Sequence, residues 1–186
     1  IDDTLTGDDR SMRQLTDLIN DRDDILFGIA TGRNLQSARA FIEENRLPDP
    51  SLLITSVGTR IDYNFGRVSH DLHWDRQIQF RWQPHEIRNL LSQIDWLEPQ
   101  EPETQSHDKI SYYLDRPQPS AARAIKTLLR KSSLQARVVV SRNRCVDVLP
   151  VRASKGHALR YVSWRFGIDM SHVLTAGDSG NDIDML

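Results

Sequence analysis

Apolar and polar positions along this chain follow two rhythms, which predict where helices and strands form. From residue 8 to about 21, apolar residues recur at helical spacing, and Ser11 is available as a helix cap. Continuous apolar runs at 25–30 and 52–55 are typical of buried strands, and a second helical pattern at 35–42 separates them. Strands and helices that alternate in such short order predict a parallel, right-handed α/β layer.

The pattern changes after Gly58 and changes back after Pro150. Between them we expect strands and amphipathic helices of an α+β unit, with strands at 61–63, 68–72, 110–114, 136–140 and 145–149 and helices at 84–94 and 120–129. A helix at 155–166 and an apolar strand at 172–176 then return to the first pattern. We therefore predict a core domain, 1–63 and 150–186, with an inserted α+β domain, 64–149.

Composition narrows the range of partners. The chain has 186 residues and a formal net charge of −2, and its basic residues are dispersed, so we expect neither nucleic acid nor a membrane as a partner. Its single cysteine, Cys145, cannot form an internal disulfide, which favours a cytoplasmic location. Neither end has the polar character of a natural terminus, and we expect the chain to be a fragment.

The most informative stretch is the acidic turn that closes the chain. Gly177-Asp178-Ser179-Gly180-Asn181-Asp182 directly follows the predicted strand at 172–176, which places Asp178 and Asp182 at the carboxyl edge of the sheet. Mg²⁺ commonly joins one or two carboxylates to a substrate phosphate, so the turn predicts phosphate chemistry at a magnesium site. The alternative is a helix start that these residues only cap.

Three further clusters lie at the ends of predicted elements of the same sheet. Asp2 stands in a second acidic turn, Thr31-Gly32-Arg33 follows a strand, and Ser154-Lys155-Gly156 opens a helix. A lysine there opposes the helix dipole, so we expect an anion nearby. Carboxylates, a hydroxyl and a cation together are a set suited to phosphoryl transfer.

These clusters resemble the four motifs of the haloacid dehalogenase superfamily. Asp2 and Thr4 match the third and fifth positions of its first motif, Asp-x-Asp-x-Thr, while Thr31, Lys155 and the closing turn match motifs two, three and four. The nucleophilic aspartate of the family would be the residue before Ile1, so we expect this fragment by itself to be inactive. The resemblance implies a Rossmann-like core and an enzyme that hydrolyses phosphate esters through an aspartyl-phosphate.

Spacing identifies the branch of the superfamily. Too few residues separate Thr4 from Thr31 for a large insertion, whereas about 120 residues between Arg33 and Lys155 are far more than the core needs. An α+β cap at that place resembles the branch of sucrose-phosphate phosphatases and related sugar phosphatases. Similar modules form the carboxyl-terminal region of sucrose-phosphate synthases, and sequence patterns alone do not separate the two.

The resemblance also implies roles for single residues. Asp2 would act as acid and base, and its backbone carbonyl would bind Mg²⁺. The Asp178 carboxylate would bind Mg²⁺ directly, and Asp182 would bind it through a water molecule or contact one of its ligands. Lys155 would neutralise negative charge, and Thr31, Gly32 and Arg33 would surround the phosphoryl oxygens. Asn181 would orient phosphate or Lys155, or only cap a helix.

Substrate choice is expected to lie in the cap, because the four motifs recognise only phosphate. Glu103, Gln105, His107 and Lys109 alternate along a predicted strand, so Gln105 and Lys109 are candidates for binding sugar hydroxyls; a solvated sheet face is an equal alternative. The leading hypothesis is a Mg²⁺-dependent sugar-phosphate phosphatase acting on sucrose 6-phosphate. The alternatives are a non-hydrolytic domain of a sucrose-phosphate synthase, fused to its glycosyltransferase, and a phosphatase of broad range.

Overall fold

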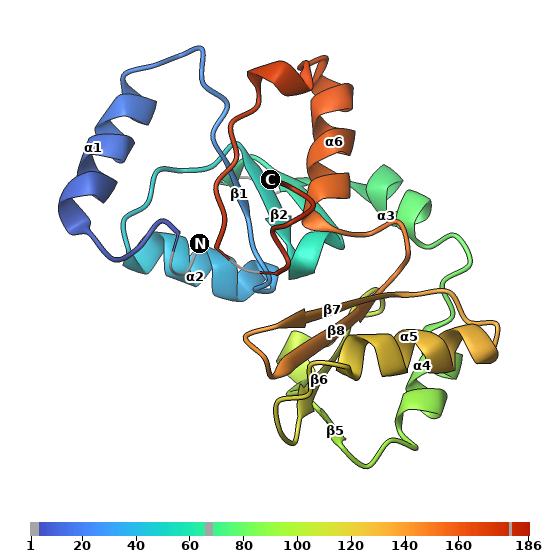
Figure 1. The fold of residues 1–186 in the computed structure, drawn as a ribbon. Helices are drawn as coiled ribbons and strands as arrows, with labels where there is room; N and C mark the ends of the chain where they lie inside the picture. Colours follow the sequence, from blue (N-terminus) through green and yellow to red (C-terminus); the bar gives the residue numbers. More distant parts are fainter. Residues whose placement is uncertain (1–3, 66–68, 179) are drawn as a thin grey trace.

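The computed structural model describes residues 4–65, 69–178 and 180–186, which form two sheets with their helices (Figure 1). The first sheet has the order β1-β2-β3-β4, with β1 at Gly28–Ala30, β2 at Leu52–Thr55, β3 at Arg60–Tyr63 and β4 at Ser69–His70. β1 and β2 are parallel, as predicted, whereas β3 and β4 add antiparallel strands. The helices of this unit are α1 (Asp9–Asn20), α2 (Leu35–Glu44), α3 (Leu72–Ile78) and α6 (Lys155–Phe166).

Side-chain caps fix where these helices begin. The predicted cap of α1, Ser11, is wrong: Asp8 is the N-cap and accepts a hydrogen bond from the Arg10 amide, and the Ser11 hydroxyl donates to the same carboxylate. α6 begins at Lys155 because the Ser154 hydroxyl accepts from the His157 amide. It ends at Gly167, whose left-handed φ of 66° suits glycine.

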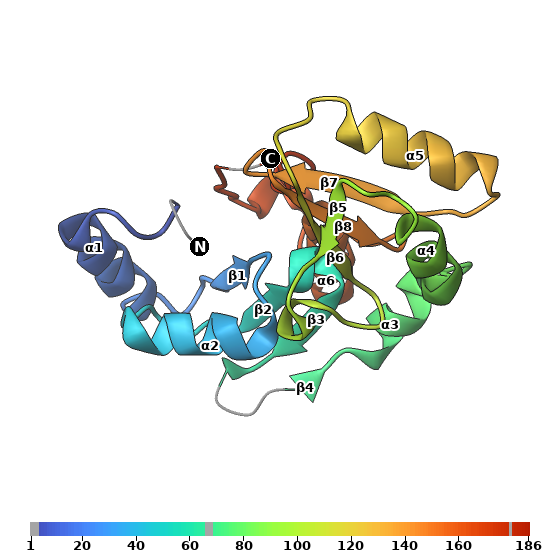
Figure 2. The same ribbon diagram turned by 90° about the horizontal axis from the view of Figure 1, so that it is seen from below.

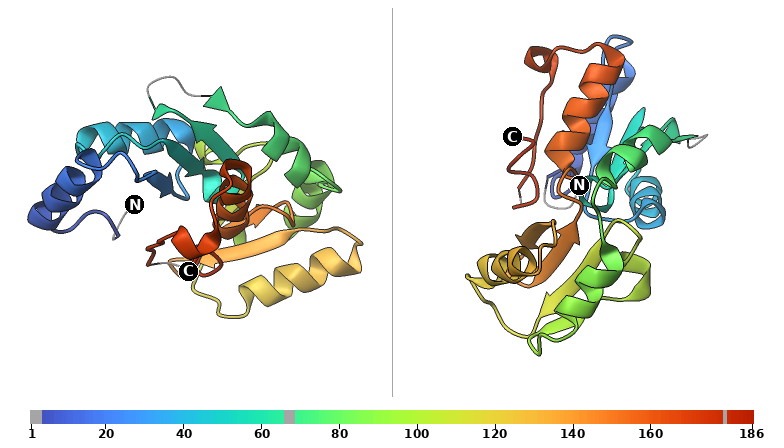
Figure 3. Two further views of the ribbon diagram at one scale, coloured as in Figure 1. Left: turned by 90° about the horizontal axis from the view of Figure 1, so that it is seen from above. Right: turned by 90° about the vertical axis from the view of Figure 1, so that its right-hand side faces the viewer.

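The second sheet is antiparallel and carries its helices on one face (Figure 3). Its order is β5-β6-β8-β7, with β5 at Leu97–Pro99, β6 at Ile110–Leu114, β7 at Arg137–Ser141 and β8 at Cys145–Leu149. α4 (Pro84–Leu91) and α5 (Ala121–Lys131) bury Ile87 and Ile125 against alternate strand residues such as Val146 and Val148. This is the predicted α+β unit, with β5 as a strand that the sequence pattern did not reveal.

The opposite face of the second sheet turns toward the first unit, as Figure 2 shows from below. Strand register puts Ser111, Asp147 and Val139 side by side on this face, and Arg137 beside Leu149. Leu149 belongs to the same buried cluster as residues of β2, and Val139 packs against it. The two sheets are therefore joined by an apolar contact that brings polar residues of the second sheet toward the first.

Packing bears on the predicted boundary at residue 64. β4 pairs with β3, and Trp74 and Ile78 of α3 are buried in the cluster that β2 and β3 build. The helix at 72–78 was not predicted, and residue 68 of the expected strand at 68–72 lies outside the described residues. We propose to place the domain boundary after Ile78.

The predicted strand at 172–176 is wrong in this structure. A 3₁₀ turn spans Met170–His172, and residues 173–178 run on without strand pairing, with Leu174 98% exposed. A strand requires a neighbour for its backbone N–H and C=O groups, and among the described residues no strand pairs with this segment. Its apolar composition alone does not make it a strand.

The turn that follows β2 is in close contact with the residues that begin α6. β2 ends in a 3₁₀ turn at Ser56–Gly58, and Gly58 has a φ of 90°. A Cβ on Gly58 would lie 2.2 Å from the backbone carbon of Ser154, so only glycine fits there. The start of α6 therefore rests directly on the loop that follows β2.

None of the helices in the described part of the chain has the length and apolarity needed to span a bilayer. The cytoplasmic location stays a prediction.

Asp71 caps α3 with a buried carboxylate that joins three elements. This carboxylate accepts hydrogen bonds from the Tyr63 hydroxyl of β3 at 2.7 Å, the Tyr161 hydroxyl of α6 at 3.2 Å and the Trp74 amide at 3.0 Å. Burial alone would raise the pKa of Asp71, but these hydrogen bonds, led by the one from Tyr63, and the charge of Arg165 outweigh it and lower the pKa.

A lowered pKa makes this carboxylate a source of stability that acid removes. The contribution is present above the ordinary pKa of an aspartate, about 4, and is lost as the pH falls through the lower pKa of the folded state. We expect Asp71→Asn to lower the free energy of unfolding at pH 7, and its difference from the parent to shrink below about pH 4. Urea unfolding from pH 3 to 7 measures this, with exposed Asp95→Asn as the control; a difference that is the same at both ends would contradict it.

Candidate active site

The two ends of the described chain meet through one hydrogen bond. The Thr4 hydroxyl donates to Oδ1 of Asp178 at 2.7 Å, although 174 positions separate the two residues. The first and fourth motifs therefore lie side by side, as expected for one site. Asp2, predicted as acid, base and metal ligand, lies outside the described residues.

Lys155 joins the third motif to the fourth. Its Nζ donates to Oδ1 of Asp182 at 2.7 Å and to Oδ1 of Asn181 at 3.2 Å. Lys155 and Asp182 are each only 4% exposed. Removing one partner of such a buried pair costs about 3–5 kcal/mol, because the other charge is left uncompensated. The anion expected near the start of α6 is thus the Asp182 carboxylate.

The second motif touches the same turn. Thr31 is buried directly after β1, where its amide donates to the Ile54 carbonyl at 2.8 Å and its carbonyl accepts from the Val57 amide at 3.1 Å. A Cβ on Gly32 would lie 3.5 Å from Nδ2 of Asn181, so the loop after β1 lies against the acidic turn. Four segments that the sequence separates therefore converge at one place.

Arg33 lies just before α2, and residues of that helix hold its side chain. Its guanidinium donates to the Ser37 hydroxyl at 3.1 Å and lies 4.4 Å from the centre of the Phe41 ring. Its amide donates to the Thr31 hydroxyl oxygen at 3.2 Å. These contacts orient Arg33 along α2, and its role in substrate binding stays a prediction.

The backbone at Gly177 and Asp178 lies against the side chain of Asp182. The Asp178 amide donates to Oδ2 of Asp182 at 3.4 Å, and a Cβ on Gly177 would lie 2.5 Å from Cβ of Asp182. The described residues contain no group of three acidic, histidine or cysteine side chains able to hold a metal. Two carboxylates nevertheless suit Mg²⁺, which takes one or two from a protein and completes its shell with water and phosphate. Asp182 is paired with Lys155, and the role of Asp178 as the direct metal ligand stays a prediction.

The predicted sugar-binding strand is not a strand. Residues 102–104 form a 3₁₀ turn, and residues 105–109 form a loop that leads into β6. Proline at the start of the turn explains the difference, since it lacks the N–H that strand pairing uses. This loop nevertheless reaches the second motif, because Nδ2 of Asn34 donates to the Glu103 carbonyl at 2.7 Å.

In this structure the side chains of Gln105 and Lys109 form hydrogen bonds with other residues of the chain. The Gln105 amide group donates to the carbonyls of Gln100 and Ser111 and accepts from the Ser111 amide. Lys109 is buried, and its Nζ lies 2.9 Å from the Thr104 carbonyl, 2.6 Å from the Ser111 hydroxyl and 3.1 Å from Oδ1 of Asp147. Both side chains hold the loop onto the second sheet, and their contact with a sugar stays a prediction.

Sequence reasoning missed Asp184. Its Oδ1 accepts from the Gly156 amide at 3.2 Å, next to Lys155 in the helix. The sequence indicates Asp184 only by its position two residues after Asp182, and nothing in the sequence distinguishes it from the other acidic residues nearby. Spacing could not show which of these carboxylates turns toward α6.

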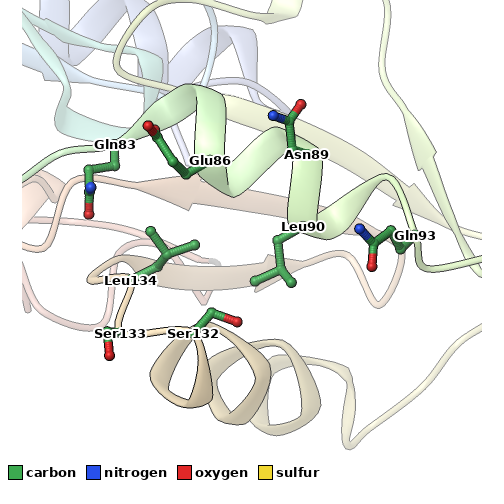
Figure 4. A pocket seen from close by; sticks show the side chains of 8 residues that line it. All are labelled: Gln83, Glu86, Asn89, Leu90, Gln93, Ser132, Ser133 and Leu134. Atoms are coloured by element: carbon green, nitrogen blue, oxygen red, sulfur yellow. The ribbon is translucent and has the colours of Figure 1, made fainter.

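A separate hollow lies away from these motifs (Figure 4). It has a volume of about 530 Å³ between α4 and the segment that follows α5, lined by Gln83, Glu86, Asn89, Leu90, Gln93, Ser132, Ser133 and Leu134. None of the predicted site residues lines it. The candidate site is therefore the convergence of the four motifs.

Comparison with known families agrees with this geometry. The family model of sucrose-6F-phosphate phosphohydrolase matches residues 1–186. The chain belongs to this family. Sucrose-6F-phosphate phosphohydrolases are hydrolases, so the chain is part of an enzyme family of phosphatases.

Similar proteins carry related names. The chain is 28% identical to the mannosylfructose-phosphate phosphatase of Agrobacterium fabrum, with 98% of this chain and 74% of that protein covered. It is 29% identical to sucrose-phosphatase 2 of Nicotiana tabacum, with 89% of this chain and 40% of that protein covered. It is 33% identical to a haloacid dehalogenase-like hydrolase of Nitrosococcus oceani, covering 89% of this chain. The chain spans less than half of the last two proteins, 40% and 47% respectively.

Solved structures confirm the fold of the family. The sucrose-phosphatase of Synechocystis, solved in complex with sucrose and phosphate, superposes with a TM-score of 0.92 at 32% identity, covering 99% of this chain and 75% of that one. A haloacid dehalogenase-like hydrolase from Bacillus subtilis superposes with a TM-score of 0.64 at 15% identity, covering 92% of this chain and 78% of that one, and supports the fold alone. The predicted haloacid dehalogenase-like α/β fold is confirmed.

Lys155 provides a test of the site. If Lys155 has its predicted role, we expect Lys155→Ala in the whole protein to lower kcat by about 100-fold, because a buried cation that would neutralise the phosphoryl group is removed, while KM changes by less than about threefold. Steady-state phosphate release measures both constants, and a thermal melt checks that the variant folds. Lys126→Ala, on the exposed side of α5, is the matched control. An unchanged kcat in the folded Lys155 variant would contradict the assignment.

Proposed function

We propose that the protein to which this chain belongs hydrolyses the phosphate ester of a sugar, with sucrose 6-phosphate as the leading candidate. One observation carries the proposal: the Thr4 hydroxyl, the Lys155 cation and the loop that follows Thr31, which come from distant segments, all contact the acidic turn that carries Asp178. Family membership supports the same reaction. The convergence supplies a place for one phosphoryl group.

Each group has a defined task in this proposal. Lys155 neutralises negative charge on the phosphoryl group, and the buried Thr31 hydroxyl binds one of its oxygens. Asn181 accepts a hydrogen bond from Lys155 and so orients the lysine toward the phosphoryl group. Mg²⁺ held by Asp178 would supply a further positive charge against the phosphoryl oxygens.

The covalent route follows from the family resemblance. An aspartate before Ile1 would attack phosphorus and displace the sugar oxygen, which Asp2 protonates; water would then cleave the aspartyl-phosphate, with Asp2 accepting its proton. Both positions lie outside the described residues. The Thr4 hydroxyl, two positions after Asp2, would tie this motif to Asp178.

The substrate class is supported by the relatives and by the second sheet. The relatives include sucrose-phosphatases and a mannosylfructose-phosphate phosphatase. Each of these names refers to the phosphate of a disaccharide that contains fructose. The Asn34 side chain, directly after the second motif, donates to the Glu103 carbonyl, so a sugar bound at the phosphate would have polar groups of the loop at 102–109 nearby. We therefore propose a disaccharide phosphate as the substrate.

A substrate panel tests the function. The whole protein with Mg²⁺ should release phosphate from sucrose 6-phosphate with a kcat/KM at least about tenfold above that for p-nitrophenyl phosphate, because the sugar contacts add to transition-state binding. Mannosylfructose phosphate and glucose 6-phosphate complete the panel. Similar turnover on all esters would favour a broad-range phosphatase. No release from any of them would end the proposal and favour a non-hydrolytic synthase domain.

Metal binding gives an independent test. We expect Asp178→Asn to weaken Mg²⁺ binding by about tenfold or more, because an amide oxygen replaces the charged ligand. Isothermal titration calorimetry with MgCl₂ measures this without any substrate. Asp95→Asn, at an exposed position of the second unit, should bind Mg²⁺ like the parent. Equal affinities of the parent and the Asp178 variant would remove Asp178 from the metal site.

A further inference from the structure

An ion pair joins the second sheet to Asp184, two residues after the acidic turn. NH1 of Arg137, in β7, lies 3.2 Å from Oδ2 of Asp184. Arg137 stands on the face of the second sheet that turns toward the first unit, beside Leu149. A Cβ on Gly180 would lie 3.2 Å from the Val140 carbonyl, so β7 also touches the turn through its backbone. The contact between β7 and the turn is therefore close at two points.

Asp184 also contacts the start of α6. Its Oδ1 accepts from the Gly156 amide at 3.2 Å, and its backbone carbonyl accepts from NH1 of Arg160 at 3.1 Å. A Cβ on Gly156 would lie 1.9 Å from the Asp184 carbonyl oxygen, so the backbones are in direct contact. A carboxylate at the first turn of a helix also satisfies an amide that has no partner within the helix.

His157 is the other neighbour of Arg137. Its Nδ1 lies 3.4 Å from NH2 of Arg137 and 3.0 Å from the Arg152 carbonyl oxygen. Burial, followed by the charge of Arg137, lowers the pKa of His157. The ring is therefore neutral near pH 7, and the charge of Arg137 is compensated by Asp184.

We propose that Arg137 is a positioning residue for phosphate hydrolysis: it holds the Asp184 carboxylate against the Gly156 amide and so fixes Lys155 relative to the acidic turn. This inference rests on the proposed function of the same site. In this proposal Arg137 acts through Asp184, which lies between it and the Gly156 amide. The arrangement couples the second sheet to the groups that are proposed to hold phosphate.

Amide exchange tests the coupling without any catalysis. We expect Arg137→Met to raise the hydrogen exchange rate of the Gly156 amide by about two- to fivefold, the range that a partly exposed ion pair supports. Arg137→Lys, which keeps the charge, should restore most of the protection, and Asp184→Ala should abolish it. NMR of the ¹⁵N-labelled chain measures these rates. Amides within β8 report general destabilisation and should not change.

Kinetics tests the consequence for the reaction. In the whole protein, Arg137→Met should lower kcat for sucrose 6-phosphate by about two- to fivefold and leave KM within about twofold, whereas Arg130→Met, on the exposed side of α5, changes neither. Combining Arg137→Met with Asp184→Ala should add no further loss of kcat to that of Asp184→Ala alone.

Two results would overturn the inference. The first is an unchanged Gly156 exchange rate in Arg137→Met, and the second is an unchanged kcat beside a raised KM. A parent protein that hydrolyses no phosphate ester would refute the proposed function, and the exchange measurement would still decide whether Arg137 fixes the start of α6.

Discussion

The buried ion pair between Lys155 and Asp182 is the interaction on which the rest of the site depends. It joins the first residue of α6 to the acidic turn, and both partners are almost fully removed from solvent. Charges at such depth remain only where each compensates the other, so the pair fixes the distance between helix and turn. Thr4 and Gly32 then contact this turn through Asp178 and Asn181. The site is thus assembled around one pair.

The second sheet has two faces with different tasks. Its apolar face packs α4 and α5 into a core of its own, which makes the unit stable as a layer. Its other face carries Ser111, Asp147 and Arg137, and turns toward the first unit. Strand periodicity produces both faces from the same residues, since neighbours along a strand point in opposite directions. Arg137, which pairs with Asp184, consequently lies on the face that turns toward the first unit.

Hydrogen bonds add to the apolar contact between the units. The Asn34 side chain donates to the Glu103 carbonyl, and NH1 of Arg137 donates to Oδ2 of Asp184. Such hydrogen bonds are modest one by one, whereas the shared apolar contact through Leu149 is continuous with the core of the first sheet. The arrangement positions the loop at 102–109 over the second motif while both cores remain separate.

Sequence by itself determined the helices at 9–20, 35–44 and 155–166, the strands at 52–55 and 110–114, and the order of the four motifs, because these depend on local periodicity, caps and spacing. It failed at 172–176, where an apolar run lacks a pairing strand among the described residues, and at 103–109, where Pro102 begins a turn. Only the tertiary structure decided that Asp184 turns toward Gly156 and Arg137, and that Lys109 is buried against Asp147. Side chains that pair across a long distance in the sequence produce no periodic sequence pattern. Their pairing is therefore decided only when the sheets pack together.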